Sequence, residues 1–252
     1  MIFTKSFGRL LFVFIWLCFG TAQAQTCRDL LFEGKSYTAC TVAASEDLRL
    51  FNAGPDGPYG SFKVLDDALK EQGLALGFAM NAGMFHRDLA PVGLYVELGQ
   101  QGMRLITSDG PGNFGLLPNG VFCITDAGFA VTESLRFKSA KPECRYATQS
   151  GPMLVIEGAL HPKFRPGSDS RLIRNGVGTR ADGQTAVFVI SNEAVNFHEF
   201  ARLFRDELGL PNALFLDGTI SRLYDPDHGR HDGGFPIGPI VGTVVPRTPG
   251  EG

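Results

Sequence analysis

Apolar residues along this chain gather in short runs, and several of these runs end abruptly in a polar loop. Residues 74–80, 186–190 and 213–216 are continuous apolar runs, which is the pattern of strands buried on both faces. Residues 37–42 and 48–51 alternate, as half-buried strands of a meander do. The pattern predicts many short strands, with polar side chains placed directly after the buried ones.

Two segments have the pattern of a helix. Ser61 is positioned to cap a helix over residues 62–72, in which apolar residues form one stripe. Asn196 is positioned to cap a second helix over residues 197–208, with Glu199 completing a capping box. Because the second helix lies between two buried strands with short connections, the pattern predicts a βαβ crossover with both strands parallel.

The predicted crossover brings several polar side chains to one edge of the sheet. The carboxyl ends of both strands and the amino end of the helix lie on the same side of such a unit. The residues at these ends are Ser191, Asn192, Asn196, His198 and Asp217. Ligands of α/β sheets bind at this edge, and a helix amino end favours anions such as phosphate.

Turn residues divide the rest of the chain into further short elements. In chain order these are a hairpin from 91–97 and 103–107, a hairpin from 121–125 and 129–132, a helical or irregular segment at 134–148, a strand at 153–156, and a polar, basic loop at 161–174 closed by a glycine-rich turn at 175–178. With 32 glycines and 21 phenylalanines, this mixture predicts an α+β fold. We expect a single mixed domain with a largely antiparallel sheet and a C-terminal βαβ unit.

The amino-terminal segment has the organisation of a secretory signal peptide. Lys5 and Arg9 give a positive start, residues 10–19 are apolar, and small residues end the segment at Ala24. Cleavage after Ala24 leaves a domain over residues 25–252 and predicts a periplasmic or secreted protein. No other stretch approaches the ~20 apolar residues of a membrane-spanning helix. The net charge of −3 gives no electrostatic reason to expect nucleic acid as a partner.

Four cysteines remain after such a cleavage, and an oxidising compartment favours their pairing as disulfides. Three connectivities are possible, and closeness in sequence favours Cys27 with Cys40 and Cys123 with Cys144. A zinc site is the weaker alternative, because no pair has C-x-x-C spacing. Cysteine catalysis is disfavoured, since every thiol has a possible partner.

Motifs argue against several enzyme classes. The chain contains no G-x-S-x-G elbow, no Walker loop and no dinucleotide-binding fingerprint. Residues 225–232 contain five possible metal ligands, but their spacing matches no EF-hand loop, and polar loops of this composition are more often simply solvated. No metal and no other cofactor is therefore predicted.

Two kinds of residue remain as candidates for chemistry at the predicted edge. Asp217 directly follows a buried strand, where a rigid sheet would hold its carboxylate; the alternative is an Asx-turn aspartate before Gly218. Arg171 and Arg174 are close enough in sequence to clamp a phosphate together; the alternative is a solvated basic loop. An acidic side chain facing an arginine clamp indicates a phosphorylated substrate.

Five motifs in order resemble those of the phosphodiester glycosidase family. They are Asn81-Ala82-Gly83-Met84-Phe85, Pro91-Val92-Gly93, Ser150-Gly151-Pro152-Met153-Leu154, Arg174-Asn175-Gly176-Val177-Gly178 and Leu216-Asp217-Gly218-Thr219-Ile220-Ser221. The resemblance runs from about residue 74 to residue 245. The chain departs from the family at Ala82, where glycine is frequent, and at Thr219-Ile220, where a glycine pair is more usual. These departures bear on sugar specificity.

The resemblance implies hydrolysis of the bond between a sugar's anomeric carbon and a phosphodiester. Asp217 then supports an oxocarbenium-like transition state as nucleophile, base or electrostatic partner. Arg174 stabilises the departing phosphate monoester, which is already a stable anion near neutral pH. Glu97 is the best candidate for a second catalytic acid, with a solvated hairpin end as the alternative role.

The resemblance and the predicted edge together give a set of substrate-binding candidates. They are Asn81, Gly83, Ser150, Gly151, Arg171, Asn196, His198, Gly218 and Ser221. For Asn81 the alternative is a turn residue that tolerates left-handed φ, and for His198 it is a surface histidine.

The function predicted from the sequence is secreted hydrolysis of a sugar-1-phosphodiester, such as an N-acetylglucosaminyl phosphodiester. One alternative is an envelope- or carbohydrate-binding protein of the same fold without catalysis. Another is metal-dependent cleavage at phosphorus. The expected partner is a small or polymer-linked sugar phosphodiester, and the sequence gives no indication of the oligomeric state.

Overall fold

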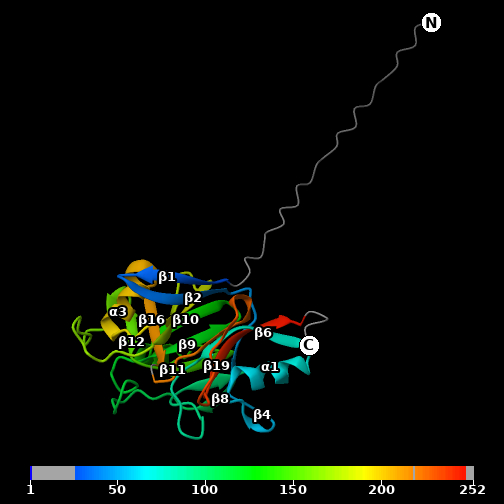
Figure 1. The fold of residues 1–252 in the computed structure, drawn as a ribbon, viewed down its shortest axis with the longest axis horizontal. Helices are drawn as coiled ribbons and strands as arrows, with labels where there is room; N and C mark the ends of the chain where they lie inside the picture. Colours follow the sequence, from blue (N-terminus) through cyan, green and yellow to red (C-terminus); the bar gives the residue numbers. More distant parts are fainter. Residues whose placement is uncertain (2–25, 218, 248–252) are drawn as a thin grey trace.

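Within the residues that the structure describes, the strands form three large antiparallel sheets and a two-stranded ribbon (Figure 1). The computed structural model describes Met1, residues 26–217 and residues 219–247, so the predicted signal peptide lies outside the described residues. The largest sheet consists, in spatial order, of β1 (Thr26–Phe32), β2 (Lys35–Ala43), β15 (Thr185–Ser191), β14 (Asn175–Thr179), β16 (Asn212–Asp217), β12 (Met153–Ile156) and β13 (Ala159–Leu160).

Two further sheets pack against this one. The second consists of β10 (Gly128–Glu133), β9 (Gly120–Thr125), β11 (Tyr146–Ser150), β7 (Tyr95–Glu97) and β8 (Gln100–Met103). The third consists of β18 (Arg230–His231), β17 (Leu223–Asp225), β6 (Leu74–Asn81), β19 (Ile240–Pro246) and β3 (Leu48–Phe51). The ribbon is β4 (Ala53–Gly54) with β5 (Gly57–Pro58).

The helices cover the outside of the sheets. They are α1 (Phe62–Lys70), α2 (Ser134–Ala140), α3 (Phe197–Arg202) continued by a π-helical segment η1 (Leu203–Glu207), and the short 3₁₀ turn η2 (Pro226–His228). Figure 1 shows α3 beside β16 and β12 at one side of the molecule and α1 beside β6 at the other. The predicted caps are present: Ser61 accepts a hydrogen bond from the Val64 N–H, and Asn196 forms a capping box with Glu199.

Both faces of the largest sheet are buried, which explains its continuous apolar runs. On one face, Phe188 of β15 contacts Phe78 of β6 and Phe122 of β9, with ring centroids 5.1 and 5.5 Å apart. On the other face, Val189 packs in one cluster with Phe200 of α3. Because successive side chains of a strand point to opposite faces, a strand covered on both sides is apolar at every position.

The predicted crossover is present, with one additional strand inside it. β15 and β16 are joined through α3 and run parallel to each other, but β14 lies between them and pairs antiparallel with both. The register places Asn175 opposite both Ile190 of β15 and Asp217 of β16. The carboxyl ends of β15 and β16 therefore lie at one edge, as predicted, two strand spacings or ~10 Å apart.

The glycine-rich segment that was predicted as a turn is instead β14, a central strand buried at every position. A Cβ atom on Gly176 would lie 2.7 Å from the Leu214 carbonyl oxygen, and one on Gly178 would lie 2.7 Å from Leu210 Cδ1. The two glycines are therefore required by close packing of the neighbouring strand and of the chain that follows η1. Glycine inside a strand marks such close approach, whereas the same composition is more typical of turns.

Three other segments differ from their predicted bounds. The hairpin of β7 and β8 ends earlier than predicted, because the Ile106 N–H donates to the Gln149 side chain at 2.9 Å instead of joining a strand. The segment predicted as helical or irregular divides into α2 and the start of β11. The helix that begins at Phe197 becomes π-helical from Leu203 onward.

Both predicted disulfides are confirmed. Cys27 and Cys40 join the paired strands β1 and β2, and Cys123 of β9 is bonded to Cys144 just before β11. Each bond thus links segments that are also neighbours in a sheet. Among the described residues, no helix has both the length and the apolar character needed to cross a membrane.

Candidate functional site

Three strand ends from two sheets meet at one edge of the molecule through hydrogen bonds. The Asp217 N–H, at the end of β16, donates to Asn175 Oδ1 at 2.9 Å. Asn175 Nδ2 donates in turn to the Asn81 carbonyl oxygen at 2.8 Å and to Asn81 Oδ1 at 3.2 Å. Asn81 ends β6 of the third sheet, so one buried amide joins the largest sheet to its neighbour. The predicted residues Asn81 and Asp217 therefore belong to one hydrogen-bonded group, which is centred on Asn175.

The orientation of the Asn81 amide is set by its partners. Its Oδ1 accepts from Asn175 Nδ2 and from the Arg222 N–H, the latter at 2.9 Å. Since two donors converge on that atom, it is the oxygen and the other is the nitrogen. Nδ2 is buried and has no hydrogen-bond partner among the described residues. A buried donor without a partner costs free energy, so Nδ2 is a place where a ligand oxygen would be favoured.

The second sheet contributes the serine motif to the same group. Ser150 Oγ, at the end of β11, donates to the Leu216 carbonyl oxygen at 2.8 Å, and Thr148 Oγ1 donates to the Ala82 carbonyl oxygen at 2.9 Å. A Cβ on Gly83 would lie 3.1 Å from Thr148 Oγ1, so a side chain there would press on this bond. The segments that contain Asn81, Ser150 and Asp217 are therefore packed together, although 136 residues separate the first from the last (217 − 81).

Asp217 is both a carboxylate at the end of a buried strand and the first residue of an Asx turn, which are the two roles that its place in the sequence allowed. Its side chain is 8% exposed at the end of a buried strand, and its Oδ1 accepts a hydrogen bond from the Thr219 N–H at 2.9 Å, which closes an Asx turn. Ser221 Oγ donates to the Asp217 carbonyl oxygen and lies 3.3 Å from Asn175 Oδ1, so the loop after β16 folds back onto its own strand end. Gly218 lies outside the described residues.

Arg174 is enclosed beneath α3. Its guanidinium stacks on Phe197, 3.8 Å from the ring centroid, and donates to the carbonyl oxygens of Val195 at 2.9 Å and Ser170 at 2.8 Å. Burial lowers the pKa of Arg174 to about 10, which still leaves it protonated at neutral pH. Its Nη1 is buried and has no partner among the residues described. The backbone N–H of Arg174 donates to Ser191 Oγ at 2.9 Å, which ties the start of β14 to the end of β15.

Arg171, the second predicted clamp residue, is bound by an acidic side chain. Its two terminal nitrogens contact the carboxylate of Glu199 at 2.7 and 2.8 Å in a bidentate pair. This pair raises the pKa of Arg171 through its hydrogen bond to Glu199. Glu199 also accepts from the Asn196 N–H, so the pair belongs to the cap of α3. A role of Arg171 in substrate binding stays a prediction.

Two further candidates lie at the amino end of α3. Asn196 is fully buried; its Oδ1 accepts from the Glu199 N–H, and its Nδ2 donates to the carbonyl oxygens of Pro166 and Ser168. These bonds attach the basic loop to the helix. His198 is half-buried on the first turn of α3. Their predicted contacts with substrate are not tested by this geometry.

Glu97 does not join the group around Asp217. It belongs to β7, where the register places Tyr95 opposite Thr148, so Glu97 lies four strand positions, ~13 Å, from the level of Ser150. Its carboxylate accepts from the Tyr95 hydroxyl at 2.7 Å. Burial raises the pKa of Glu97, and the Tyr95 hydrogen bond opposes that rise.

The loop at 225–232 does not collect its acidic and histidine side chains at one point. His228 pairs with Asp225, Asp232 pairs with Arg230, and His231 packs against Tyr224. No cluster of three or more histidine, cysteine or acidic side chains suited to a metal ion occurs within the part of the chain that the structure describes.

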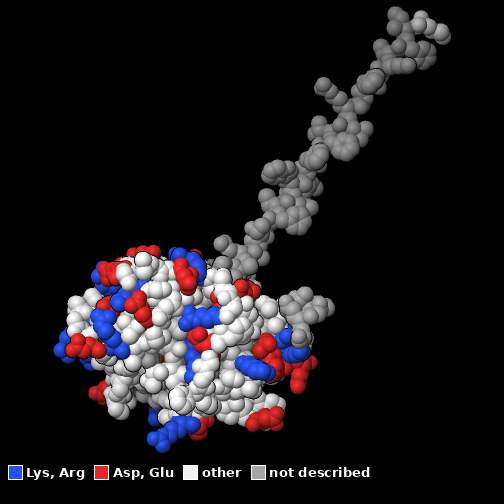
Figure 2. All heavy atoms as spheres, viewed as in Figure 1, with Lys and Arg blue, Asp and Glu red and all other residues white. Residues whose placement is uncertain are grey.

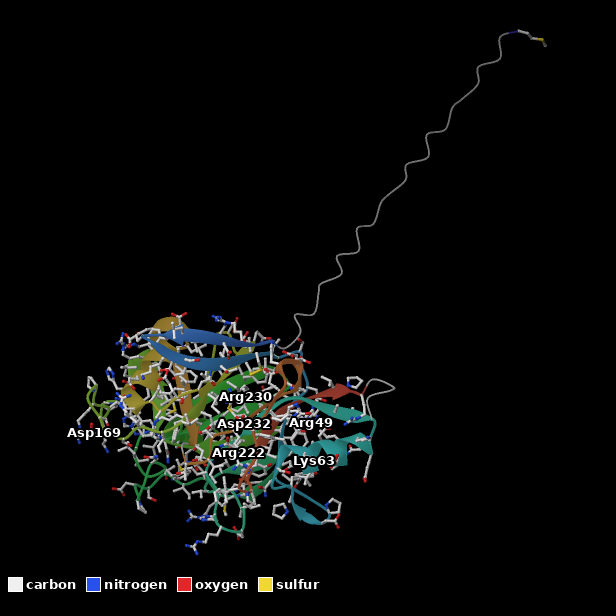
Figure 3. All side chains as sticks on the ribbon, in the orientation of Figure 1. Arg49, Lys63, Asp169, Arg222, Arg230 and Asp232 are labelled. Carbon is white, nitrogen blue, oxygen red and sulfur yellow. A yellow bond between two sulfur atoms is a disulfide. The ribbon has the colours of Figure 1, made fainter. Side chains whose placement is uncertain are left out.

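Arg222, which is not among the residues predicted from the sequence, is bonded to the same group around Asn175. Its N–H binds Asn81 Oδ1, its guanidinium donates to the Phe235 carbonyl oxygen, and burial lowers its pKa. Figure 3 shows Arg222, Asp232 and Arg230 following one another on one face of the molecule. The signal in the sequence was position alone, because Arg222 directly follows the motif that ends at Ser221. Figure 2 shows basic and acidic side chains interspersed over this face, without a large area of one sign.

Comparison with known proteins adds a family to this geometry. The family described as phosphodiester glycosidase matches residues 76–227. "Uncharacterized protein YigE" of Escherichia coli strain K12 is 40% identical over 166 residues, which are 66% of this chain and 64% of that protein. The match thus spans slightly less than two thirds of this curated relative.

Two solved structures share the fold. A hypothetical protein from Synechocystis superposes with a TM-score of 0.58 at 15% identity, covering 88% of this chain and 62% of that chain. The catalytic domain of zebrafish N-acetylglucosamine-1-phosphodiester alpha-N-acetylglucosaminidase, auto-inhibited by its pro-peptide, superposes with a TM-score of 0.57 at 14% identity, covering 87% of this chain and 81% of that chain. The match to the family includes every motif segment described above from Asn81 to Ser221.

Proposed function

This chain belongs to the phosphodiester glycosidase family, and we propose that it hydrolyses the glycosidic bond of a sugar-1-phosphodiester. The products are a free sugar and a phosphate monoester. An N-acetylglucosaminyl phosphodiester is the first substrate to test, because the zebrafish structural neighbour is named for that bond. The predicted secretion fits the two disulfides, which persist in oxidising compartments.

One observation carries the proposal. Asn175 joins the backbone of Asp217 to Asn81, and the Asn81 amide is oriented so that its buried Nδ2 lacks a partner among the described residues. A carboxylate and an unused hydrogen-bond donor are therefore held within one network at the strand ends. Sugar hydroxyls and phosphate oxygens are acceptors of the kind that this donor requires.

Asp217 is proposed to stabilise the positive charge that develops at the anomeric carbon. The bond between that carbon and the phosphate oxygen breaks, and its electron pair leaves with the phosphate. A water oxygen completes the new bond to carbon, and one proton of that water is released. A carboxylate beside an oxocarbenium-like transition state lowers the barrier electrostatically, or by a covalent intermediate that water later hydrolyses.

No protonated carboxyl group is needed for the leaving group. Ordinary glycosidases protonate an alkoxide, but here the departing group is a phosphate monoester with a second pKa of about 6, so it leaves as a stable anion. This fits the position of Glu97, which lies ~13 Å along the sheet from Ser150. Arg222 is the proposed cation for the departing phosphate, since its backbone is bonded to Asn81 itself. Arg174 then acts as a positioning residue that fixes the start of β14.

Hydrolysis in oxygen-18 water tests the proposal. Methyl α-N-acetylglucosaminyl phosphate is incubated with the purified protein, and both products are analysed by mass spectrometry. Cleavage at carbon places the heavy oxygen in the sugar, whereas cleavage at phosphorus places it in the phosphate. Label in the sugar is the expected result; label in the phosphate, or no turnover of any sugar phosphodiester, contradicts the proposal.

Asp217→Asn separates charge from structure. Asparagine can accept the Thr219 N–H as aspartate does, so the Asx turn is kept and only the negative charge is removed. Turnover should fall by about 10³-fold or more, which is the scale of losing a transition-state charge partner. Asp56→Asn is the matched control, since Asp56 is exposed in the loop between β4 and β5.

The Asx turn itself supports the competing hypothesis of a binding protein without catalysis. In that case the Asp217 carboxylate serves the turn, and Asp217→Asn leaves both folding and ligand affinity unchanged. Saturable binding of the phosphodiester without release of free sugar, equal in the wild type and in this variant, would establish the binding function instead.

A further inference from the structure

A cavity of about 400 Å³, lined by both polar and apolar groups, lies beside the site and is not used by the chemistry proposed above. It is enclosed by β1, β2 and the residue after β15 on one side, and by the β17 to β18 segment on the other. Its polar lining includes Asp29, Thr38, Asn192, Asp225, His228 and Arg230. Pockets that bind small molecules have volumes of roughly 300–1,000 Å³, so this one has a suitable size for a single sugar ring.

The polar lining is fixed by internal bonds before any ligand enters. Thr38, which is 5% exposed, donates its hydroxyl to Asp29 at 2.6 Å. Arg230 Nη1 donates to Asn192 Oδ1 at 2.8 Å and lies 3.1 Å from Thr38 Oγ1. Asp225, which is 4% exposed, holds His228 Nδ1 at 2.7 Å. Side chains held in this way lose little conformational entropy when they bind.

The chemistry of the lining favours a neutral ligand with hydroxyl groups. The carboxylates of Asp29 and Asp225 accept from Thr38 and His228, and Arg230 is paired with Asp232 at 3.1 Å. The cavity is also lined by Arg28, so two basic side chains, Arg28 and Arg230, face two acidic ones, Asp29 and Asp225, and the formal charges of the lining balance with His228 counted as neutral. Hydroxyl groups both donate and accept, so they suit a wall in which donors and acceptors alternate. The Cys27–Cys40 disulfide adds an apolar patch, because Cys27 lines the cavity as well.

The cavity is placed to receive the part of the substrate beyond the phosphate. Asn192 follows the end of β15, which lies two strands, ~10 Å, from the end of β16 in the same sheet. On the opposite wall, Asp232 binds both Arg230 and the Leu223 N–H, which directly follows Arg222 in the chain. Figure 3 shows Arg222, Asp232 and Arg230 in sequence along this path. A phosphate at Arg222 would thus carry its second substituent toward the cavity.

We propose that this cavity binds a sugar or polyol group that the substrate carries on the far side of its phosphodiester. The proposal rests on the proposed function and extends it from the bond that is cleaved to the group that is released with the phosphate. It predicts that the protein distinguishes substrates by the leaving alcohol as well as by the sugar.

Kinetics with two leaving groups test the proposal. The ratio of kcat/KM for a hexosyl over a methyl ester of the same sugar phosphate should exceed about 10, the equivalent of one or two hydrogen bonds to a polar wall. Thr38→Val combined with Asn192→Ala should lower that ratio by about tenfold. Asn113→Ala, in the loop before β9, is the control and should leave the ratio as in the wild type. An unchanged ratio in the double variant overturns the proposal.

A binding experiment keeps this result separate from the proposed hydrolysis. The isotope-labelled protein is titrated with methyl α-glucopyranoside and, separately, with inorganic phosphate, while NMR follows the Arg230 side chain and the His228 ring, which line the cavity and are unchanged in the double variant. Shifts with the glycoside alone, lost in the double variant, support a sugar subsite even if no phosphodiester is turned over. Shifts with phosphate alone identify an anion site, and no shift with either probe excludes the cavity as a ligand site; both results overturn the proposal.

Discussion

Replacing Asn175 by alanine removes the amide that joins two sheets at the candidate site. In the native protein this side chain accepts from the Asp217 N–H and donates to the Asn81 carbonyl oxygen, at 2.9 and 2.8 Å. All three residues lie within the buried part of the edge. Water cannot easily replace the missing partner there, so the variant leaves one backbone donor and one backbone acceptor with a lost bond.

The expected loss of stability follows from counting these groups. A buried polar group that loses its partner costs about 1–3 kcal/mol, so two such groups give about 2–6 kcal/mol. That is a large share of the roughly 5–15 kcal/mol that keeps a typical domain folded. The contact of Ser221 Oγ with Asn175 Oδ1 is longer, at 3.3 Å, and adds little to this sum.

Urea unfolding followed by circular dichroism measures the effect. Asn113→Ala is the matched control, since the half-buried Asn113 lies in a loop and should change stability by less than about 0.5 kcal/mol. Asn175→Asp is a second probe, because a carboxylate keeps the acceptor for Asp217 but cannot donate to Asn81. This variant should regain stability as the pH falls, when the protonated acid can donate again. A loss below about 1 kcal/mol for Asn175→Ala, or no gain for Asn175→Asp in acid, would refute the reasoning.

Three further predictions concern folding and the candidate residues. Replacing Cys123 and Cys144 by serine should cost about 3 kcal/mol in urea unfolding, because the bond closes a loop with a sequence separation of 21 residues. Arg171→Ala should change stability little in urea unfolding, since its pair with Glu199 is partly exposed to solvent, and a large loss of turnover in this variant would reveal a direct role in binding. Glu97→Gln should stabilise the protein near neutral pH but not below the ordinary carboxyl pKa of 4.5, because burial raises the pKa of Glu97 and the cost of its charge develops as pH rises. Thermal unfolding of the wild type and of Glu97→Gln, near neutral pH and below pH 4.5, gives the sign of the change in stability.

The sequence predicted those parts of the fold that depend on local patterns. The apolar runs ending at Asn81, Ser191 and Asp217 became β6, β15 and β16 with nearly the predicted bounds, because a strand covered on both faces leaves a continuous apolar signature. Both disulfides also followed from closeness in sequence, since each pair lies in segments that are neighbours in a sheet. These features require no knowledge of distant contacts.

β14 could not be predicted in the same way. Its composition is that of a turn, and only the close approach of Leu214 and Leu210 explains why Gly176 and Gly178 occupy a central strand. This difference matters for the site, because the segment that directly follows Arg174 belongs to a sheet ladder and is not a loop. Pairing between distant strands decides such cases, and it leaves little trace in a local pattern.

Only part of the candidate site could be predicted from the sequence, and the reason is related. Asp217 and Asn81 are each a polar residue that directly follows an apolar run. This signal is visible in the sequence of each strand alone. The partners of Arg171 and Arg174 are not marked in this way, because Glu199 and Phe197 reach them only after α3 has packed on the sheet. Long cationic side chains near a predicted edge therefore identify candidates, but their contacts depend on the packing of the neighbouring helix.

The meeting of three sheets explains why each family motif is so short. Ser150 comes from the second sheet, Asn81 from the third and Asp217 from the largest, and each contributes one or two polar groups at the end of a strand. The strands behind them need only be apolar and of the right length, which many sequences satisfy. The polar groups have less freedom, since Ser150, Asn81 and the Asp217 backbone are each hydrogen-bonded to a group from another segment. A change at one strand end should therefore alter the position of the Asp217 carboxylate even when the substituted residue never touches the substrate.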